Sequence, residues 1–173
     1  MERKQASCYW ITGLSGSGKT TLSTFLADHV RSSGRAVVQL DGDELRGVLA
    51  TDAYTREERI AIGMRYSRLC KLIASQGIDV VIGVIGLFEE IHRWNRENIP
   101  GYIEVFIDTP MDELQRRDLK GIYARAQSGN ISNVAGVDLE VDYPADPHIH
   151  LRWEEGKEVH IMTAELVEKI ASC

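Results

Sequence analysis

The segment that most constrains the fold of this chain runs from Gly13 to Thr20 and has the sequence GLSGSGKT, a match to the pattern GxxxxGK[ST]. A short β-branched and aromatic run, Cys8–Thr12, precedes it, and a helical pattern with one apolar face follows it. Glycines in such a loop let backbone N–H groups turn toward phosphate oxygens, and the N-terminus of the following helix adds partial positive charge. The order of strand, loop and helix therefore predicts a phosphate-binding loop.

The residue types of this loop divide the work of holding a nucleotide triphosphate. Lys19 is expected to reach the β- and γ-phosphates, and the Thr20 hydroxyl is placed to hold Mg²⁺. The residues expected to contact the nucleotide here are Gly13, Ser15, Gly16, Ser17, Gly18, Lys19, Thr20 and Thr21. GTPase switches and motor ATPases carry the same loop, but commonly place an acid at the end of a buried apolar strand. Here the strand predicted at 79–85 is followed by Gly86, which favours a small phosphotransferase.

Short apolar runs alternate with helical patterns along the chain. Strands are predicted at Cys8–Thr12 and at residues 36–40, 79–85, 102–107 and 159–162. Helices are predicted after the loop as far as Gly34, and at residues 56–75, 87–98, 111–117 and 163–171. This alternation predicts an α/β fold, a P-loop NTPase-like three-layer sandwich with a mostly parallel five-stranded sheet flanked by helices. At 173 residues, the whole chain (1–173) is expected to form one kinase domain.

Composition limits the partners and the location of the protein. Lys and Arg number 20 against 26 Asp and Glu, for a net charge of −6, which argues against a non-specific nucleic-acid binder. No apolar run is long enough to cross a bilayer, and the charged N-terminus does not resemble a signal peptide. Cys8 and Cys70 are expected to be small core residues rather than disulfide partners or metal ligands. A cytoplasmic enzyme that makes no membrane contact is the expectation.

Two carboxylates, Asp41 and Asp43, directly follow the predicted strand 36–40. Ligands of open α/β sheets bind at the carboxyl ends of the strands, so these groups are expected to lie opposite the phosphate-binding loop. There they can complete the Mg²⁺ shell or accept a proton from an attacking hydroxyl. Arg46 lies on the same face if the segment is helical, and can then pair with an anionic acceptor. The alternative is an Asx turn that caps a short helix and leaves Arg46 solvated.

Residues 118–146 depart from the alternation of strands and helices. This stretch contains Gly121, Gly129 and Gly136 but no convincing strand. Long irregular connections inside a compact domain are usually functional or disordered. In a nucleotide enzyme, a lid that closes over the substrates is the expected role.

Taken together, these motifs resemble the adenylylsulfate (APS) kinase family, small P-loop enzymes that phosphorylate the ribose 3′-hydroxyl of APS. The resemblance rests on YWITGLSGSGKTTL, LDGDELR, GYIEVFIDTPMDELQRRDLKGIYARAQSGNI and GVD…YPADP. These motifs occur in order from Tyr9 to about Pro147, so the resemblance covers most of the chain. It implies ATP as the donor, Mg²⁺ as the metal, a role in sulfate assimilation and a homodimer.

The resemblance also implies roles for individual residues. Asp43 is implied as the catalytic acid/base and as a Mg²⁺ ligand with Thr20, while Asp41 supports it and Lys19 acts on the phosphates. Arg117 would lie near the ATP base. The residues implied to bind the acceptor are Arg46, Tyr54, Arg59 and Lys120; the two arginines suit an anion and Tyr54 suits an adenine.

Departures from the family pattern cluster on the acceptor side. Where the family pattern has an Asn three residues after the arginine at position 59, this sequence has Ile62. Where the family has a cation after the third strand, this sequence has Glu89, and the aromatic residue of the family's lid is here Val134. Exchanging groups that hydrogen-bond a ligand changes specificity. The first expectation is phosphorylation of the 3′-hydroxyl of APS, and the alternative is a related nucleotide such as cytidine diphosphoramidate. A non-catalytic nucleotide-binding module and a kinase for a sugar or other small alcohol are further alternatives.

Overall fold

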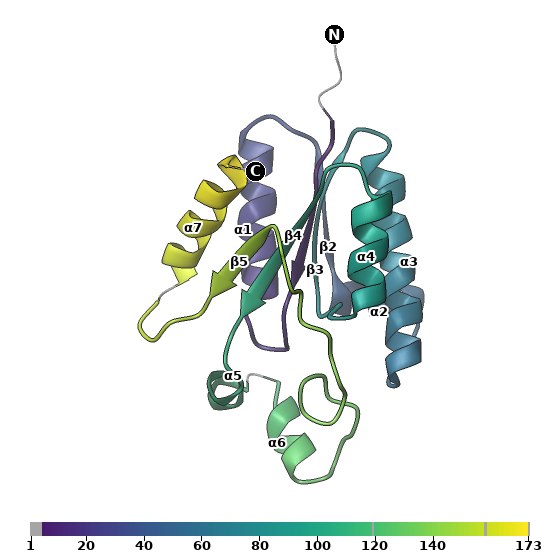
Figure 1. The fold of residues 1–173 in the computed structure, drawn as a ribbon, viewed down its shortest axis with the longest axis vertical. Helices are drawn as coiled ribbons and strands as arrows, with labels where there is room; N and C mark the ends of the chain where they lie inside the picture. The colour runs from purple at the N-terminus through teal and green to yellow at the C-terminus, as the bar shows by residue number, and fades with distance from the viewer. Residues whose placement is uncertain (1–4, 119, 158, 173) are drawn as a thin grey trace.

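A central sheet of five parallel strands organises the molecule, whose computed structural model describes residues 5–118, 120–157 and 159–172. The strand order is β2-β3-β1-β4-β5, and every pair is parallel. The strands are β1 (Cys8–Thr12), β2 (Val37–Asp41), β3 (Asp79–Val84), β4 (Tyr102–Asp108) and β5 (Ile149–Arg152). All five carboxyl ends point toward the same edge of the sheet, the lower edge in Figure 1.

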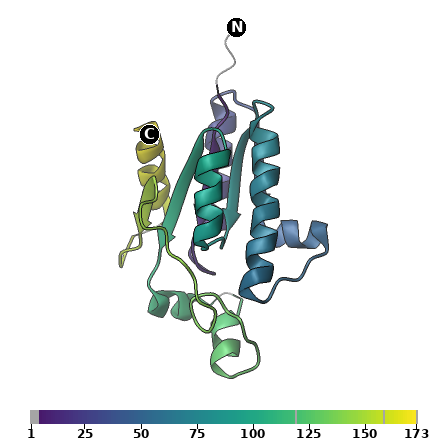
Figure 2. The same ribbon diagram turned by 45° about the vertical axis from the view of Figure 1, so that its right-hand side comes forward.

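Helices cover both faces of this sheet. They are α1 (Lys19–Ser32), α2 (Gly42–Leu49), α3 (Arg56–Ala74), α4 (Glu89–Asn98), α5 (Met111–Arg117), α6 (Ile122–Gln127) and α7 (Val159–Ala171). Helices α1 and α7 lie on one face and α3 and α4 on the other, as the two views in Figures 1 and 2 show. The predicted three-layer arrangement is confirmed.

The side chains of β1 explain why the sheet needs both layers. Cys8 and Trp10 point into the core beneath α3 and α4, whereas Tyr9 and Ile11 point into the core beneath α1 and α7. All four are at most 3% exposed. A strand buried on both faces is continuously apolar rather than alternating, which is the pattern of a central parallel strand. The core positions predicted for Cys8 and Cys70 are confirmed, since both are fully buried.

The last strand was predicted in the wrong place. Residues 159–162 form the first turn of α7, and the fifth strand is β5, Ile149–Arg152. The buried side chains Met162 and Leu166 recur at a spacing of four residues, so the segment 159–162 shares the apolar stripe of the helix that follows it. In β5, by contrast, Ile149 and Leu151 are buried in alternation with more exposed neighbours, a period of two that is short and easily missed.

The segment predicted as a lid lies beyond the carboxyl edge of the sheet (Figure 2). Apart from residue 119, which is outside the described residues, it consists of turns, the short helix α6 and one isolated bridge between Ala135 and Leu139. The absence of a strand in 120–146 agrees with its glycine-rich sequence. Among the described residues, no helix combines the length and the apolar character that spanning a bilayer requires.

Candidate active site

The loop between β1 and α1 has the conformation that its glycines predict. A Cβ atom on Gly13 would lie 2.7 Å from Ser17 Oγ and 2.8 Å from the Ile107 carbonyl oxygen, so only glycine fits there. Gly18 has a φ of 98° at the N-cap of α1. The Ser17 hydroxyl is buried and has no hydrogen-bond partner in the described part of the chain. A buried polar atom without a partner inside such a loop fits a bound phosphate.

Lys19 lies at the start of α1 with its ammonium group folded back on the loop. Its Nζ donates to the Leu14 carbonyl oxygen at 2.7 Å. Burial of the ammonium, together with repulsion from Lys120, lowers the pKa of Lys19 to about 7, although the residue as a whole keeps some exposure. An ammonium held in this way is stabilised by any anion that enters the loop. Thr21, two residues after Lys19 in the first turn of α1, is exposed.

Thr20, in the first turn of α1, contacts Asp41 at the end of β2, and β3 lies between β2 and the strand β1 that precedes α1. The Thr20 hydroxyl donates to Asp41 Oδ2 at 2.9 Å. This contact depends on Gly83 of β3, because a Cβ there would approach Ser23 Oγ of α1 to 2.6 Å. Gly83 pairs in register with Asp41 and thus allows α1 to pack closely over the sheet. Sequence reasoning had assigned the metal to Thr20 and Asp43, and had given Asp41 a supporting role.

The donor atoms of this cluster suit Mg²⁺. A threonine hydroxyl and two aspartate carboxylates are hard oxygen ligands, and Mg²⁺ usually takes one or two carboxylates and completes its shell with phosphate oxygens and water. No group of three or more His, Cys, Asp or Glu side chains that could hold a metal occurs within the described residues.

Asp43 contacts both α2 and the lid segment. Asp41 caps α2 by accepting a hydrogen bond from the Asp43 backbone N–H at 2.8 Å. The Asp43 carboxylate forms ion pairs with Arg46, three residues on in α2, and with Lys120 of the lid segment. The predicted cap and the predicted shared face of Asp43 and Arg46 both occur. Lys120 thus lies beside Asp43.

Arg117 is anchored beside the phosphate-binding loop. Its Nε donates to Glu113 Oε1 at 2.6 Å and its Nη1 donates to the Gly16 carbonyl oxygen at 3.2 Å. Hydrogen bonds from Arg116 and then Arg117 lower the pKa of Glu113 to about 2. The Arg117 guanidinium also lies 5.8 Å from the centre of the Trp153 ring. A planar cation facing an indole at the edge of a phosphate loop suits a nucleobase. Helix α6 also contacts the phosphate-binding loop, because the Tyr123 hydroxyl donates to the Ser15 carbonyl oxygen at 2.8 Å.

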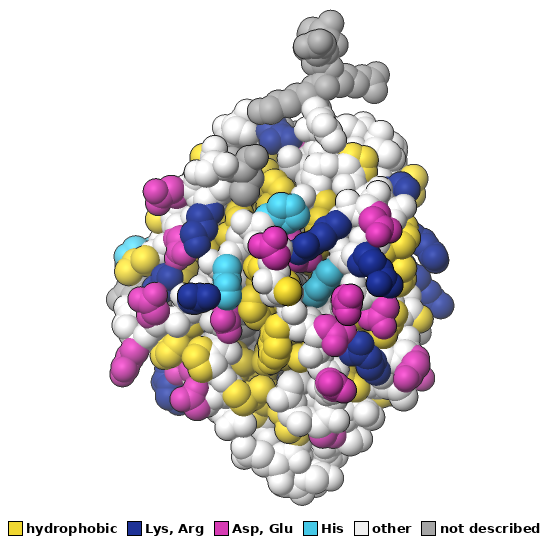
Figure 3. Space-filling view, in the orientation of Figure 1, with side chains coloured by type: hydrophobic (Ala, Val, Ile, Leu, Met, Phe, Trp, Pro, Cys, Tyr) yellow, Lys and Arg dark blue, Asp and Glu magenta, His cyan; other side chains and the backbone are white. Residues whose placement is uncertain are grey.

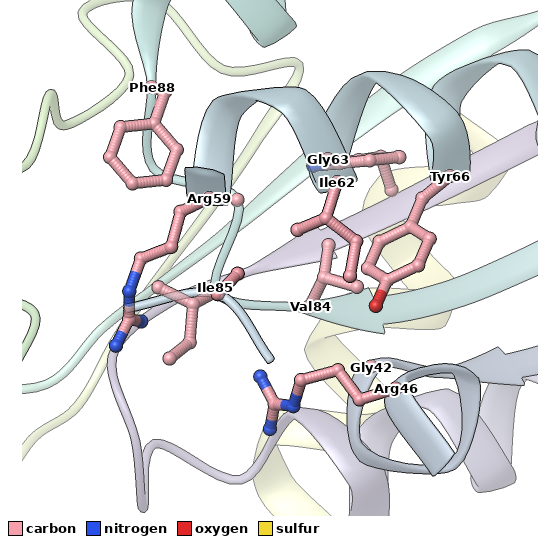
Figure 4. Close-up of a pocket in the computed structure, with 12 residues that line it drawn as sticks. Gly42, Arg46, Arg59, Ile62, Gly63, Tyr66, Val84, Ile85 and Phe88 are labelled. Carbon is pink, nitrogen blue, oxygen red and sulfur yellow. The ribbon is translucent and has the colours of Figure 1, made fainter. Parts of the chain in front are cut away.

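A cavity of about 490 Å³, part of it open to solvent, lies between α2, α3 and the end of β3 (Figure 4). Its lining combines two guanidinium groups with aliphatic and aromatic side chains. The lining residues are Trp10, Gly42, Arg46, Ala53, Arg59, Ile62, Gly63, Tyr66, Val84, Ile85, Gly86 and Phe88. Those from α3 follow the spacing of one helical face. Helix α3 begins at a capping box that Thr55 and Glu58 form.

Two cations face this cavity without a full set of anionic partners. Arg59 donates to the carbonyl oxygens of Tyr54 and Asn133, at 3.2 and 2.8 Å, but within the described residues it pairs with no carboxylate. Burial and the charge of Arg46 lower the pKa of Arg59. Two like charges that destabilise each other at one cavity are the arrangement expected of an anion site.

Tyr54 and Val134 do not line this cavity. Tyr54 is 59% exposed at the N-terminus of α3, and Val134 is 7% exposed in the packed interior of the lid segment. The sequence did not identify Tyr66 and Phe88 as lining residues. The spacing of Tyr66 four and seven residues after Ile62 and Arg59 could have placed it on their helical face.

The surface in Figure 3 carries charges of both signs. Lys and Arg side chains alternate with Asp and Glu over the face shown. Such mixing does not build the positive potential that a nucleic-acid backbone needs, at least on this face.

A phosphate-binding loop after the first strand, with two carboxylates across β3 and a cationic cavity beyond them, defines a P-loop phosphotransferase. The model of the family described as adenylylsulphate kinase matches residues 5–152, so the chain belongs to that family. It is a kinase with a hydroxyl group as acceptor.

Individual relatives act on different nucleotides. The chain is 41% identical to the cytidine diphosphoramidate kinase of Campylobacter jejuni over 78% of its own length and 79% of that protein. It is 37% identical to the adenylyl-sulfate kinase of Pseudomonas aeruginosa, over 86% of its length and 78% of that protein. Other relatives are bifunctional enzymes, of whose length the chain spans 24%. The APS kinase of Mycobacterium tuberculosis, solved in complex with AMPPNP and APS, superimposes with a TM-score of 0.87 at 29% identity, covering 96% of this chain and 98% of that one.

Proposed function

We propose that this protein transfers the γ-phosphoryl group of Mg·ATP to a ribose hydroxyl of a nucleotide, with cytidine diphosphoramidate as the preferred acceptor. The observation that carries the choice of acceptor is the burial of Val134. In the family resemblance this position is the second aromatic of an adenine sandwich, whereas here it is a small side chain buried in the hydrophobic core with Ala135 and Leu139. Among the described residues Tyr54 has no aromatic partner, which suits a pyrimidine better than a purine.

The residues of the site have distinct parts in the transfer. Thr20 with Asp43 or Asp41 would hold Mg²⁺, which when bound offsets the charge that develops on the phosphates. Lys19 and the loop N–H groups hold the β- and γ-phosphates, and Arg117 faces the donor base. Asp43 accepts the proton of the attacking ribose hydroxyl at its carboxylate oxygen. Arg46, Arg59 and Lys120 hold the anionic end of the acceptor.

APS remains the second candidate acceptor. Arg46 and Arg59 both line the acceptor cavity, and two guanidinium groups suit a phosphosulfate as well as a diphosphate. Ile62 weighs against APS because it replaces an amide that the family resemblance places beside the ligand. If APS were the acceptor, the enzyme would serve sulfate assimilation.

The test is a product assay with matched acceptors. The protein is incubated with Mg·ATP and either cytidine diphosphoramidate, CDP or APS, and the phosphorylated product is identified by mass spectrometry and ³¹P NMR. We expect kcat/KM for cytidine diphosphoramidate to exceed that for APS by about two orders of magnitude. Turnover of APS at about 1–100 s⁻¹, with the cytidine nucleotide unused, would contradict the proposal.

Four further features belong to the same proposal. We infer that residues 1–173 act as one kinase domain, that the protein works in the cytoplasm, and that it forms a homodimer. We also infer that residues 118–146 close over the bound substrates. Sedimentation with and without nucleotide tests the dimer, and a monomer at micromolar concentration would contradict it.

A further inference from the structure

Two polar groups in the lining of the acceptor cavity, the Trp10 indole N–H and the Tyr66 hydroxyl, are buried without a hydrogen-bond partner among the described residues and have no part in the proposed catalytic roles; of the two, Tyr66 can also accept a hydrogen bond. It lies on α3, one turn after Ile62, and is 5% exposed. The Tyr66 hydroxyl is buried and has no hydrogen-bond partner among the residues that the structure describes. Figure 4 shows the tyrosine beside Ile62, with its oxygen on the side of the cavity where Gly42 and Arg46 lie. A buried hydroxyl that makes no hydrogen bond costs about 1–3 kcal/mol, so a bound ligand is the expected partner.

The chemistry of the other lining side chains limits what this hydroxyl recognises. The guanidinium groups of Arg46 and Arg59 and the indole N–H of Trp10 donate hydrogen bonds and cannot accept them. The remaining lining side chains are apolar or absent. Tyr66 is therefore the one side chain in the lining that can accept a hydrogen bond. Burial raises the pKa of Tyr66, which keeps the phenol protonated and able both to accept and to donate.

We propose that Tyr66 is a specificity-determining residue whose hydroxyl oxygen accepts a hydrogen bond from an N–H group on the terminal phosphorus of the acceptor. The terminal phosphorus of a phosphoramidate carries anionic oxygen, to which Arg46 and Arg59 can donate, and also an amino group. The N–H bonds of that amino group need a hydrogen-bond acceptor, which neither arginine can supply. A terminal sulfate or phosphate carries no N–H group that could occupy the acceptor side of the tyrosine. The inference rests on the proposed function, since it assigns the group by which the same site recognises its substrate.

The test compares two acceptors that share a base and differ in one terminal atom. Cytidine diphosphoramidate and CDP are assayed with the wild-type protein, Tyr66→Phe and Tyr9→Phe. Tyr9 of β1 is the control, because it is an equally buried tyrosine, 3% exposed, whose side chain lies in the core on the opposite face of the sheet. Tyr66→Phe is expected to lower kcat/KM for the phosphoramidate about tenfold and for CDP about threefold or less. Tyr9→Phe should leave the ratio of the two unchanged.

A second variant and two binding measurements separate recognition from folding. Ile62→Asn places an amide on the same helical face, and should raise the turnover of APS relative to cytidine diphosphoramidate while Tyr66 is intact. The thermal midpoint of Tyr66→Phe should equal or exceed that of the wild type, because the variant removes a buried hydroxyl without a partner. Its affinity for AMPPNP should match the wild type, since the donor does not enter this cavity.

The outcomes distinguish this inference from the proposed function. Equal losses with both cytidine acceptors, or no loss with either, overturn the role of Tyr66 while the wild-type activity stands. A wild-type protein that phosphorylates APS but neither cytidine nucleotide overturns both. A loss confined to the phosphoramidate supports both.

Discussion

Asp43 lies between two cations. Its carboxylate pairs with Arg46 of α2 and with Lys120 of the lid segment, and it is half exposed. The acceptor's anionic end can take over both cations and leave the carboxylate beside the ribose hydroxyl.

Replacement of Asp43 by Asn is therefore expected to abolish most of the turnover. Loss of a positioned general base costs about 10²–10⁴-fold in kcat, while the loop that binds ATP is untouched. Steady-state assays give kcat, and titration with AMPPNP gives the donor affinity. Glu44→Gln, one residue further along α2 and exposed, is the matched control. Turnover within threefold of the wild type would remove Asp43 from the mechanism.

Lys19 makes nucleotide binding depend on pH. Its pKa is lowered to about 7 by burial and by Lys120 in the ligand-free protein, and the bound phosphates raise it again. Between about pH 7 and 10, binding must therefore take up as much as one proton, and affinity falls by up to about tenfold per pH unit. Calorimetry with AMPPNP at pH 8, in two buffers that differ in ionisation enthalpy, measures the uptake.

The Lys19→Met variant is the control for that measurement. It should bind AMPPNP more weakly and without the proton uptake assigned to Lys19. Equal apparent binding enthalpies for the wild type in the two buffers would contradict the lowered pKa.

At the scale of elements, the lid segment is shaped by one carboxylate. Asp138 accepts hydrogen bonds from the backbone N–H groups of Asn133 and Val134, at 2.8 and 2.6 Å. These bonds lower the pKa of Asp138 and fix the turn whose Asn133 carbonyl oxygen binds Arg59. The lid segment therefore contacts α3 through a turn that the Asp138 side chain stabilises.

Asp138→Ala should loosen this turn and weaken acceptor binding. Each hydrogen bond to a charged group contributes about 1.5–3 kcal/mol, so exchange of the Asn133 and Val134 amides should accelerate at least tenfold. Hydrogen exchange with mass spectrometry reports it, and KM for the acceptor should rise while KM for ATP changes little. Asp28→Ala removes an exposed ion pair with Arg31 on α1 and should alter neither. Unchanged protection of the turn would contradict the role of Asp138.

The elements also show where sequence reasoning succeeds and fails. The loop, the capping box of α3 and the turn at Asp41 were predictable because local hydrogen bonding fixes each of them within a few residues. The fifth strand was misplaced because four residues of alternation in β5 are a weaker signal than the apolar run that opens α7. Tyr66 was missed because its role depends on β3 and α2, which meet α3 only in the folded chain.

At the scale of the whole molecule, a buried acid connects three separate parts of the chain. Glu104 of β4 is fully buried and pairs with Arg96 of α4, while the Tyr102 hydroxyl donates to its Oε1 at 2.9 Å. Arg96 also donates to the Asp146 carbonyl oxygen at 2.6 Å, at the end of the lid segment. This network fixes where the lid returns to the sheet.

Arg96→Ala should therefore lower the free energy of unfolding and leave kcat little changed. Removing one partner of a buried pair leaves an uncompensated charge, at a cost of about 2–3 kcal/mol here because Arg96 itself keeps access to water. Urea unfolding should show this loss, and Arg96→Ala combined with Glu104→Gln should recover part of it. A double variant that is no more stable than Arg96→Ala would show that the buried charge is not the cause.

The two guanidinium groups of the cavity are already engaged by the chain itself, since Arg46 pairs with the Asp43 carboxylate and Arg59 donates to the Asn133 carbonyl oxygen of the lid segment. An anion that binds both groups must compete with these two contacts. Its binding would release Asp43 and the lid segment together. Arrival of the acceptor is in this way coupled to the release of the carboxylate proposed as the proton acceptor.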